Sequence, residues 1–152
     1  MSVAQQGALV RRVHIADPGP DAATRIRAEL GEGPLSLVAV FAAPSTAFAA
    51  LIADLTDTLA GTTVIGCITA GEINDGYREG GIVAIALPVS HFETETVLIP
   101  NLHALDPDKT VRNIIRKRAA LKAVAPHWNH EFAILLIDGL SRREDAVVAM
   151  VM

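Results

Sequence analysis

The sequence predicts an α/β protein, with a mixed, largely buried sheet and helices packed on it. Two observations predict this class. Short apolar strand patterns alternate with helical patterns through the first part of the chain, as in parallel strands that are joined by helices. Near the middle, two strand patterns follow each other across a short link, which indicates an antiparallel hairpin. The predicted order of elements is β-α-β-α-β-β-β-α-β-α.

The composition sets limits on what this protein can be. The chain has 152 residues, of which 51% are hydrophobic and 20% charged, so it can bury a real core and is not mainly disordered. We expect one domain over 8–152, behind a disordered tail over 1–7. The net charge of −4 argues against nucleic acid or an anionic membrane as the main partner. A single cysteine, no secretory signal and no uninterrupted membrane-length apolar run predict a cytoplasmic location.

The first strand and helix are predicted from alternation and helix-end signals. Residues 8–16 alternate imperfectly between apolar and polar side chains, which favours a strand. Asp17 followed by Pro18 is typical of a helix start, and Gly31 or Gly33 would end a helix over 17–30.

The next strand and helix have stronger patterns. Residues 35–42 form a nearly continuous apolar run between two prolines, which favours a buried strand. Apolar residues at helical spacing predict a helix over 45–60, with Ser45 as its cap and Gly61 after its end.

Three predicted strands and a loop fill the middle of the chain. A β-branched strand over 62–65 runs into a glycine-rich loop and then a polar loop. Strands over 82–87 and 92–99, joined by a short link, should form the antiparallel hairpin.

The last part should contain a helix, a strand and a final helix. Asp106, followed by a proline, should open a helix over 106–125. The apolar run within 131–138 predicts a fully buried strand. Ser141 should cap the final helix, with Glu144 completing a capping box.

The end of the sequence leads to a further expectation. The final helix stops on an apolar run without a C-cap signal, so we expect a truncated chain, incomplete at its C-terminus. Such a chain should be marginally stable. It should either form a homodimer through the exposed edge of the strand over 131–138 or aggregate.

The loop over 66–72 is the main candidate site, because ligands bind at the carboxyl ends of strands in α/β sheets. Main-chain N–H groups near Gly66 and Gly71, with the Thr69 hydroxyl, could hold a carboxylate or phosphate. Glu72 could pair with a ligand amine. The alternative is a glycine-rich turn around a buried thiol. The pattern matches neither a P-loop nor a dinucleotide fingerprint.

Cys67 could be a nucleophile only with a histidine base and an activated thiolate, and a small buried cysteine is the alternative. His127 and His130 lie three residues apart without a third ligand nearby, so a polar loop explains them better than zinc does. No spacing specifies a catalytic site, and we predict no enzyme, no metal and no cofactor.

Two other features could bind partners. The helical stretch 109–122 carries six basic residues and no acid, which indicates either a solvated face or an interaction surface. Asp138 and Ser141 lie between the last strand and the last helix. A helix N-terminus can bind an anion, so both residues are candidates for ligand contact, with plain capping as the alternative.

The run Val64-Ile65-Gly66-Cys67-Ile68-Thr69-Ala70-Gly71-Glu72-Ile73 resembles the signature of FIST N-terminal domains, named after F-box and intracellular signal transduction proteins. The family form is Gly-Cys-Ser-Thr-Ala-Gly-Glu-Ile, and Ile68 here replaces the serine. The segments 37–44 and 135–141 are similar to the family's second strand and its late strand-turn-helix segment.

This resemblance implies a cytoplasmic sensory domain that binds a small ligand, with amino acids the usual proposal. It also implies a C-terminal FIST domain or a signalling protein as partner. A subset of the family binds haem through a histidine, which corresponds to no particular histidine of this chain.

Overall fold

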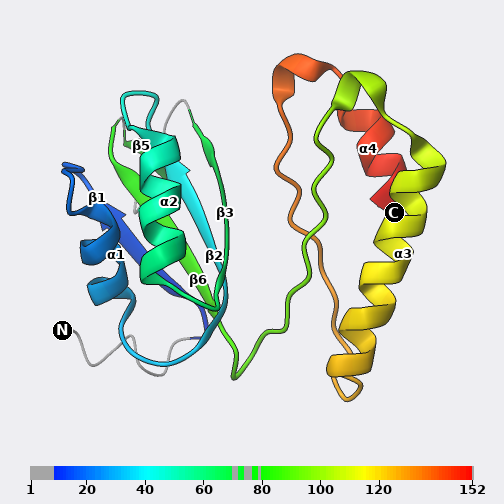
Figure 1. The fold of residues 1–152 in the computed structure, drawn as a ribbon, viewed down its shortest axis with the longest axis horizontal. Helices are drawn as coiled ribbons and strands as arrows, with labels where there is room; N and C mark the ends of the chain where they lie inside the picture. Colours follow the sequence, from blue (N-terminus) through cyan, green and yellow to red (C-terminus); the bar gives the residue numbers. More distant parts are fainter. Residues whose placement is uncertain (1–8, 70–71, 74–76, 79, 152) are drawn as a thin grey trace. The chain divides into compact units, whose positions relative to one another are not determined.

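The structure is a computed structural model that describes residues 9–69, 72–73, 77–78 and 80–151. These residues form two compact units, the first ending at Phe92 and the second covering 93–152. Figure 1 shows the elements of both. The α/β class with a mixed sheet is confirmed.

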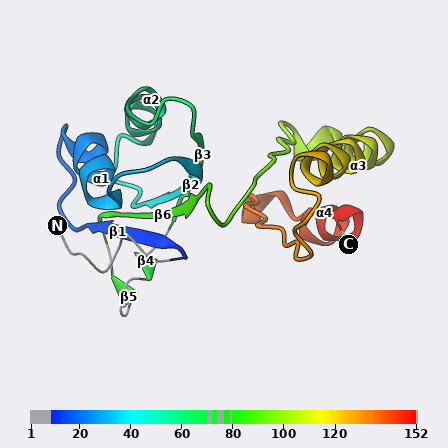
Figure 2. The ribbon, with the colours of Figure 1, turned by 90° about the horizontal axis from the view of Figure 1, so that it is seen from below.

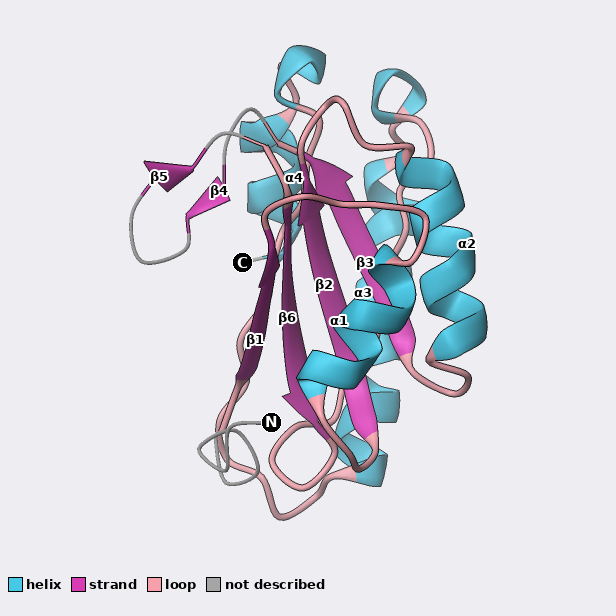
Figure 3. Cartoon of the chain, turned by 90° about the vertical axis from the view of Figure 1, so that its left-hand side faces the viewer, coloured by secondary structure: helices cyan, strands magenta, loops and turns pink. Residues whose placement is uncertain are grey.

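A four-stranded sheet forms the first unit, in the order β1-β6-β2-β3 (Figure 3). Its strands are β1 (Arg11–Ile15), β2 (Leu35–Ala42), β3 (Thr63–Ile68) and β6 (Ile82–Pro88). The pair β2 and β3 is parallel, and β6 is antiparallel to both β1 and β2. Two short strands from the predicted polar loop, β4 (Glu72–Ile73) and β5 (Tyr77–Arg78), pair with each other.

Helices α1 (Ala22–Leu30) and α2 (Phe48–Thr58) lie on one face of this sheet, and β4 and β5 lie on the other side (Figure 2). The main core lies under the helices, where Ile26 and Leu30 of α1 and Leu55 of α2 are fully buried against the strands. A smaller cluster on the opposite face contains Leu37 and Leu87. Burial on both faces explains why the sequence of β2 is apolar almost throughout.

Both helices of the first unit begin later than the sequence predicts. Helix α1 starts at Ala22 rather than at residue 17. A residue that precedes a proline is disfavoured in the helical conformation, and Gly19 precedes Pro20. Helix α2 has Ala47 rather than Ser45 at its N-cap. The glycines predicted to end these helices do follow them, and Gly31 and Gly61 both have positive φ.

The predicted hairpin of 82–87 with 92–99 is wrong. Strand β6 is already paired on both sides, with β1 and with β2, so it has no free backbone edge. The chain turns out of the sheet where the N–H groups of His91 and Phe92 both donate to the Pro88 carbonyl at 3.0 Å. Residues 92–99 form no strand.

The second unit consists mainly of helix. Helix α3 (Pro107–Val124) packs with α4 (Glu144–Val151), and two 3-10 turns, η2 (Leu102–Ala104) and η3 (Gly139–Ser141), precede them. Asp106 caps α3 as predicted, since its Oδ1 accepts from the Lys109 N–H at 3.0 Å.

The predicted buried strand over 131–138 is also wrong. That segment forms no strand, and Phe132, Ile134 and Leu135 are exposed. An apolar run becomes a strand only when a neighbouring backbone pairs with it, and no described strand does so here. The edge on which we expected homodimerisation is therefore absent from this segment, and the edge strands of the described sheet are β1 and β3.

Candidate functional site

Gly66 lies inside β3 rather than in a loop, because β3 continues to Ile68 alongside its parallel partner β2. A Cβ at this position would overlap the Val40 carbonyl oxygen and lie 3.2 Å from the Phe48 ring of α2. Close packing of β2, β3 and α2 therefore requires this glycine. The candidate loop therefore begins at Thr69 rather than at Gly66.

Cys67 also lies in β3, half-buried and without a disulfide partner. Burial raises the pKa of its thiol above the usual 9.0, so the thiol is protonated at neutral pH. A catalytic cysteine needs the opposite shift.

His14 does not lie close enough to Cys67 to act as its base. The strand register places His14, Val83, Phe41 and Cys67 in one row across the four strands. Three strand spacings separate the two ends of this row, about 14 Å. The other histidine of the first unit, His91, follows β6 at the end of the sheet where β2 begins, away from Cys67.

The carboxyl ends of β2 and β3 meet at one edge of the sheet, as predicted for parallel strands. The Thr69 N–H donates to the Ala42 carbonyl at 2.9 Å, so this N–H group is used in the sheet. Immediately after β2, the Thr46 N–H donates to the Ala43 carbonyl and closes a turn. The Thr46 hydroxyl oxygen is buried there and has no hydrogen-bond partner among the described residues.

Thr46 is a candidate that the sequence analysis missed. A buried hydroxyl without a partner is costly in a folded protein, so its position next to a strand end calls for a polar partner. The rule that drew attention to the end of β3 applies equally to the end of its parallel neighbour. Applied to β2, it points to the segment 43–46, and only the structure singles out Thr46 within it.

The structure does not bring the remaining predicted site residues together in one unit. Glu72 is the first residue of β4, and Gly71 lies outside the described residues. Asp138 and Ser141 belong to the second unit, whereas 66–72 belongs to the first.

Asp138 and Ser141 both make local hydrogen bonds. Asp138 Oδ1 accepts from the Leu140 N–H at 2.9 Å, and the Asp138 carbonyl accepts from the Ser141 N–H at 3.0 Å. Ser141 is buried and its Oγ accepts from the Arg143 N–H at 3.3 Å. Because α4 begins only at Glu144, Ser141 ends the η3 turn rather than capping the helix.

Two basic residues of α3 form ion pairs with neighbouring segments of the second unit. Lys117 lies 2.6 Å from Glu95, and Arg118 contacts both carboxylate oxygens of Glu131 at 2.6 and 2.9 Å. The hydrogen bond from Arg118 lowers the pKa of Glu131 and raises that of the guanidinium. These pairs are exposed and explain part of the basic pattern of the helix without a ligand.

No cluster of histidine, cysteine and carboxylate side chains suited to a metal ion occurs within the described ranges. None of the helices in those ranges combines the length and the apolar character that crossing a membrane requires.

Comparison with protein families matches residues 36–152 to the FIST N domain. Comparisons with curated proteins and with solved structures return no significant match. The match contains β2, β3, β6 and all of the second unit, which is more than three quarters of the chain. FIST domains are sensory domains of signal transduction. This chain therefore belongs to the FIST N domain family.

Proposed function

We propose that this chain is a cytoplasmic sensory domain that binds a small ligand of the amino acid class at the carboxyl ends of β2 and β3. Family membership supports the sensory part of this function. The observation that supports the position of the site is the unpartnered Thr46 hydroxyl, at the edge where two parallel strands end together.

The chemistry of this edge fits a ligand that carries both a carboxylate and an ammonium group. A threonine hydroxyl can donate to a carboxylate, and the main-chain N–H near Gly71, a residue outside the described ones, could add to it. The Thr69 N–H is excluded from this role because the Ala42 carbonyl accepts it. Glu72, only a few residues later, supplies a carboxylate for an ammonium group.

Signal output would require a second protein or domain. We expect a C-terminal FIST domain or a signalling protein to take that role, as membership of the FIST N domain family implies. A cysteine-dependent enzyme that uses Cys67 gains no support, since burial raises the thiol pKa and the first unit places no described histidine close to it.

Thermal melts and ¹⁵N NMR titrations of the full chain with a panel of amino acids test this function. We expect one class of amino acid to raise the melting temperature and to shift the resonances of residues 43–46 and 68–69. Thr46→Val and Glu72→Gln should each weaken binding by about tenfold, the loss expected for one good hydrogen bond or ion pair.

Two control variants match these changes on exposed helix positions. Thr58→Val lies at the end of α2 and Glu29→Gln on α1, and both should bind the ligand like the unaltered chain. If no amino acid stabilises the chain, or if the controls weaken binding as much as the site variants do, the proposed function is wrong.

A further inference from the structure

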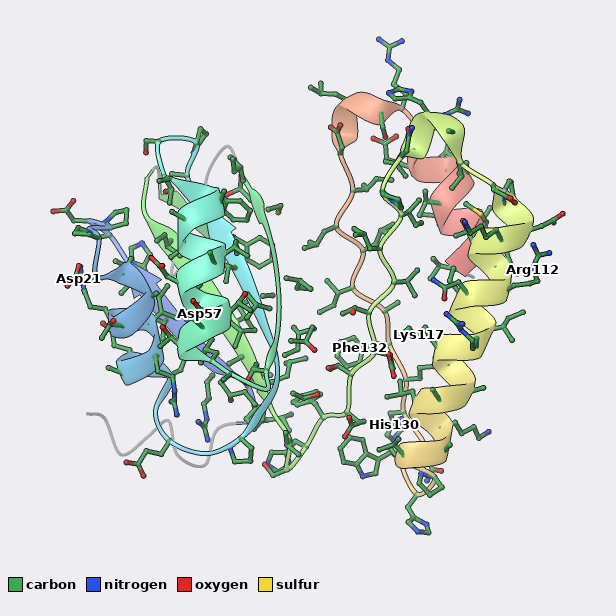
Figure 4. The ribbon with its side chains drawn as sticks, in the orientation of Figure 1. Asp21, Asp57, Arg112, Lys117, His130 and Phe132 are labelled. Atoms are coloured by element: carbon green, nitrogen blue, oxygen red, sulfur yellow. The ribbon has the colours of Figure 1, made fainter. Side chains whose placement is uncertain are left out.

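Three cations of α3 differ from the two that form ion pairs. No described carboxylate pairs with Lys109, Arg112 or Arg116, whereas Glu95 and Glu131 are used by Lys117 and Arg118. Arg112 lies nearer the start of α3 than Lys117 does (Figure 4). The three basic residues nearest the start of α3 are therefore uncompensated, whereas Lys117 and Arg118 are neutralised.

The uncompensated cations share one face of the helix. Positions 109, 112 and 116 follow the spacing of three and four residues that places side chains in one stripe. Three such charges repel one another, at a cost that a bound anion would remove. Their arrangement on one stripe allows a single small ligand to contact more than one of them.

These three side chains line a cavity of about 520 Å³ within the second unit. The opposite wall is the segment 97–101, continued by Ala104 and Leu105, and most of its residues are apolar. This volume is in the usual range for small-molecule sites, which combine apolar walls with a few polar groups. The cavity therefore has a cationic side along α3 and an apolar side along the preceding segment.

Local hydrogen bonds hold the polar lining in place. Asn113 Oδ1 accepts from the Arg116 guanidinium at 2.9 Å, which orients that group. Asn101 Oδ1 accepts from the N–H groups of His103 and Ala104 at 3.0 and 3.3 Å. The only carboxylate in the lining, Asp106, uses one oxygen to cap α3. The lining consequently keeps a net positive charge.

We propose that this cavity binds a small organic anion with two negative charges and an apolar body, such as a phosphomonoester or a dicarboxylate. Arg112 and Arg116 would hold the anionic group by charge-assisted hydrogen bonds, with Lys109 as a third charge. The apolar body would lie along Val97, Ile99 and Leu105. All of the residues of this site belong to the second unit, whereas the end of β3 belongs to the first, and the test does not depend on the proposed function.

NMR titration of the ¹⁵N-labelled full chain with phenyl phosphate and with phenylsuccinate tests the proposal, and benzyl alcohol serves as the neutral probe. We expect saturable shifts in residues 97–116 from at least one dianion and none from the alcohol. Shifts from phenyl phosphate alone would assign the site to phosphate esters. Shifts from both anions would assign it to dianions in general.

Variants distinguish binding in the cavity from a general attraction of anions to the basic residues of α3. Arg112→Gln and Arg116→Gln should each weaken binding of the dianion by about tenfold, the effect of losing one charge-assisted hydrogen bond. Lys109→Gln should weaken it less. Lys122→Gln removes a charge from the same helix outside the cavity and should leave the affinity unchanged.

Three results would overturn the proposal. The first is the absence of saturable shifts with either dianion. The second is an equal loss of affinity in Lys122→Gln, which would indicate a diffuse charge effect. The third is tight binding of a single-stranded oligonucleotide, with steep salt dependence and no competition by the small anions, which would assign the surface to nucleic acid.

Discussion

The two units of this chain differ in where their apolar side chains lie. In the first unit, strands and helices bury Ile15, Ile26, Leu55 and Ile82 almost completely. Among the described residues, Val147 is the only buried apolar residue of the second unit. The exposed large apolar side chains among the described residues of the second unit are Val97, Leu98, Ile115, Val124, Trp128, Phe132, Ile134, Leu135, Leu140 and Val148.

Outside the helices, this difference follows from backbone pairing rather than from composition. The runs 35–42 and 132–137 are both almost entirely apolar, but only the first has strand neighbours on both sides. Pairing satisfies the polar backbone groups and so allows a segment to be buried. An apolar segment without such pairing keeps its backbone in contact with water and its side chains stay exposed.

Truncation of one leucine in each unit should show the largest contrast. Leu55→Ala removes a side chain with no exposed surface and should lower the free energy of unfolding by about 2–5 kcal/mol. Leu140→Ala removes a side chain that is 91% exposed and should change it by less than about 0.5 kcal/mol. Urea denaturation measures both. Equal effects would contradict the division into a packed and a poorly buried unit.

Adding a methyl group at one glycine of each unit gives the next contrast. Gly66→Ala would place a Cβ against Val40 and Phe48, so we expect a loss of about 1–3 kcal/mol. The matched change Gly139→Ala meets only Glu144 Oε1, at 3.8 Å, and should be nearly neutral. Thermal melts compare the two. A stable Gly66→Ala variant would show that β3 does not pack as closely as described.

The Cys67 thiol provides a smaller, pH-dependent effect. Because burial raises its folded pKa, the folded state retains the proton above pH 9.0, where the unfolded chain begins to lose it. Stability associated with the protonated thiol is therefore complete below this pH and declines as the pH rises toward the folded pKa. Cys67→Ala should show a flatter decline in the same range.

Alkylation of the native chain by iodoacetamide measures the same thiol directly. The rate should reach half its maximum above pH 9.0. Rapid alkylation at neutral pH would instead indicate an activated thiolate and would revive the enzyme hypothesis.

The smallest effect should come from the exposed pair of Arg118 and Glu131 in the second unit. Its folded-state contribution is present above the ordinary carboxyl pKa of 4.5 and is lost as the pH falls through the lowered pKa of Glu131. Arg118→Gln should raise that pKa, as followed by NMR of the carboxyl carbon, without a resolvable change in melting temperature. A large destabilisation would mean that this pair organises the second unit.

Several features of the fold and the site could be predicted from the sequence. The bounds of β2, the Asp106 cap and the glycines after α1 and α2 depend on local patterns and were correct. The pairing of strands depends on residues far apart, so the hairpin after β6 and the strand over 131–138 were predicted wrongly. The strand before the candidate loop was predicted to end at residue 65, whereas β3 continues to Ile68 because its parallel partner β2 continues beside it.

By itself, the sequence determined the α/β class, the apolar faces of the first unit and the signature that identifies the family. Only the tertiary structure decided that Gly66 is a packing residue, that the Thr69 N–H is used by Ala42 and that the Thr46 hydroxyl lies without a described partner. The tertiary structure also decided that the α3 cations and the segment 97–101 line one cavity. Periodicity and caps are properties of neighbouring residues. Space and hydrogen-bond partners come from distant segments, and these meet only when the chain has folded.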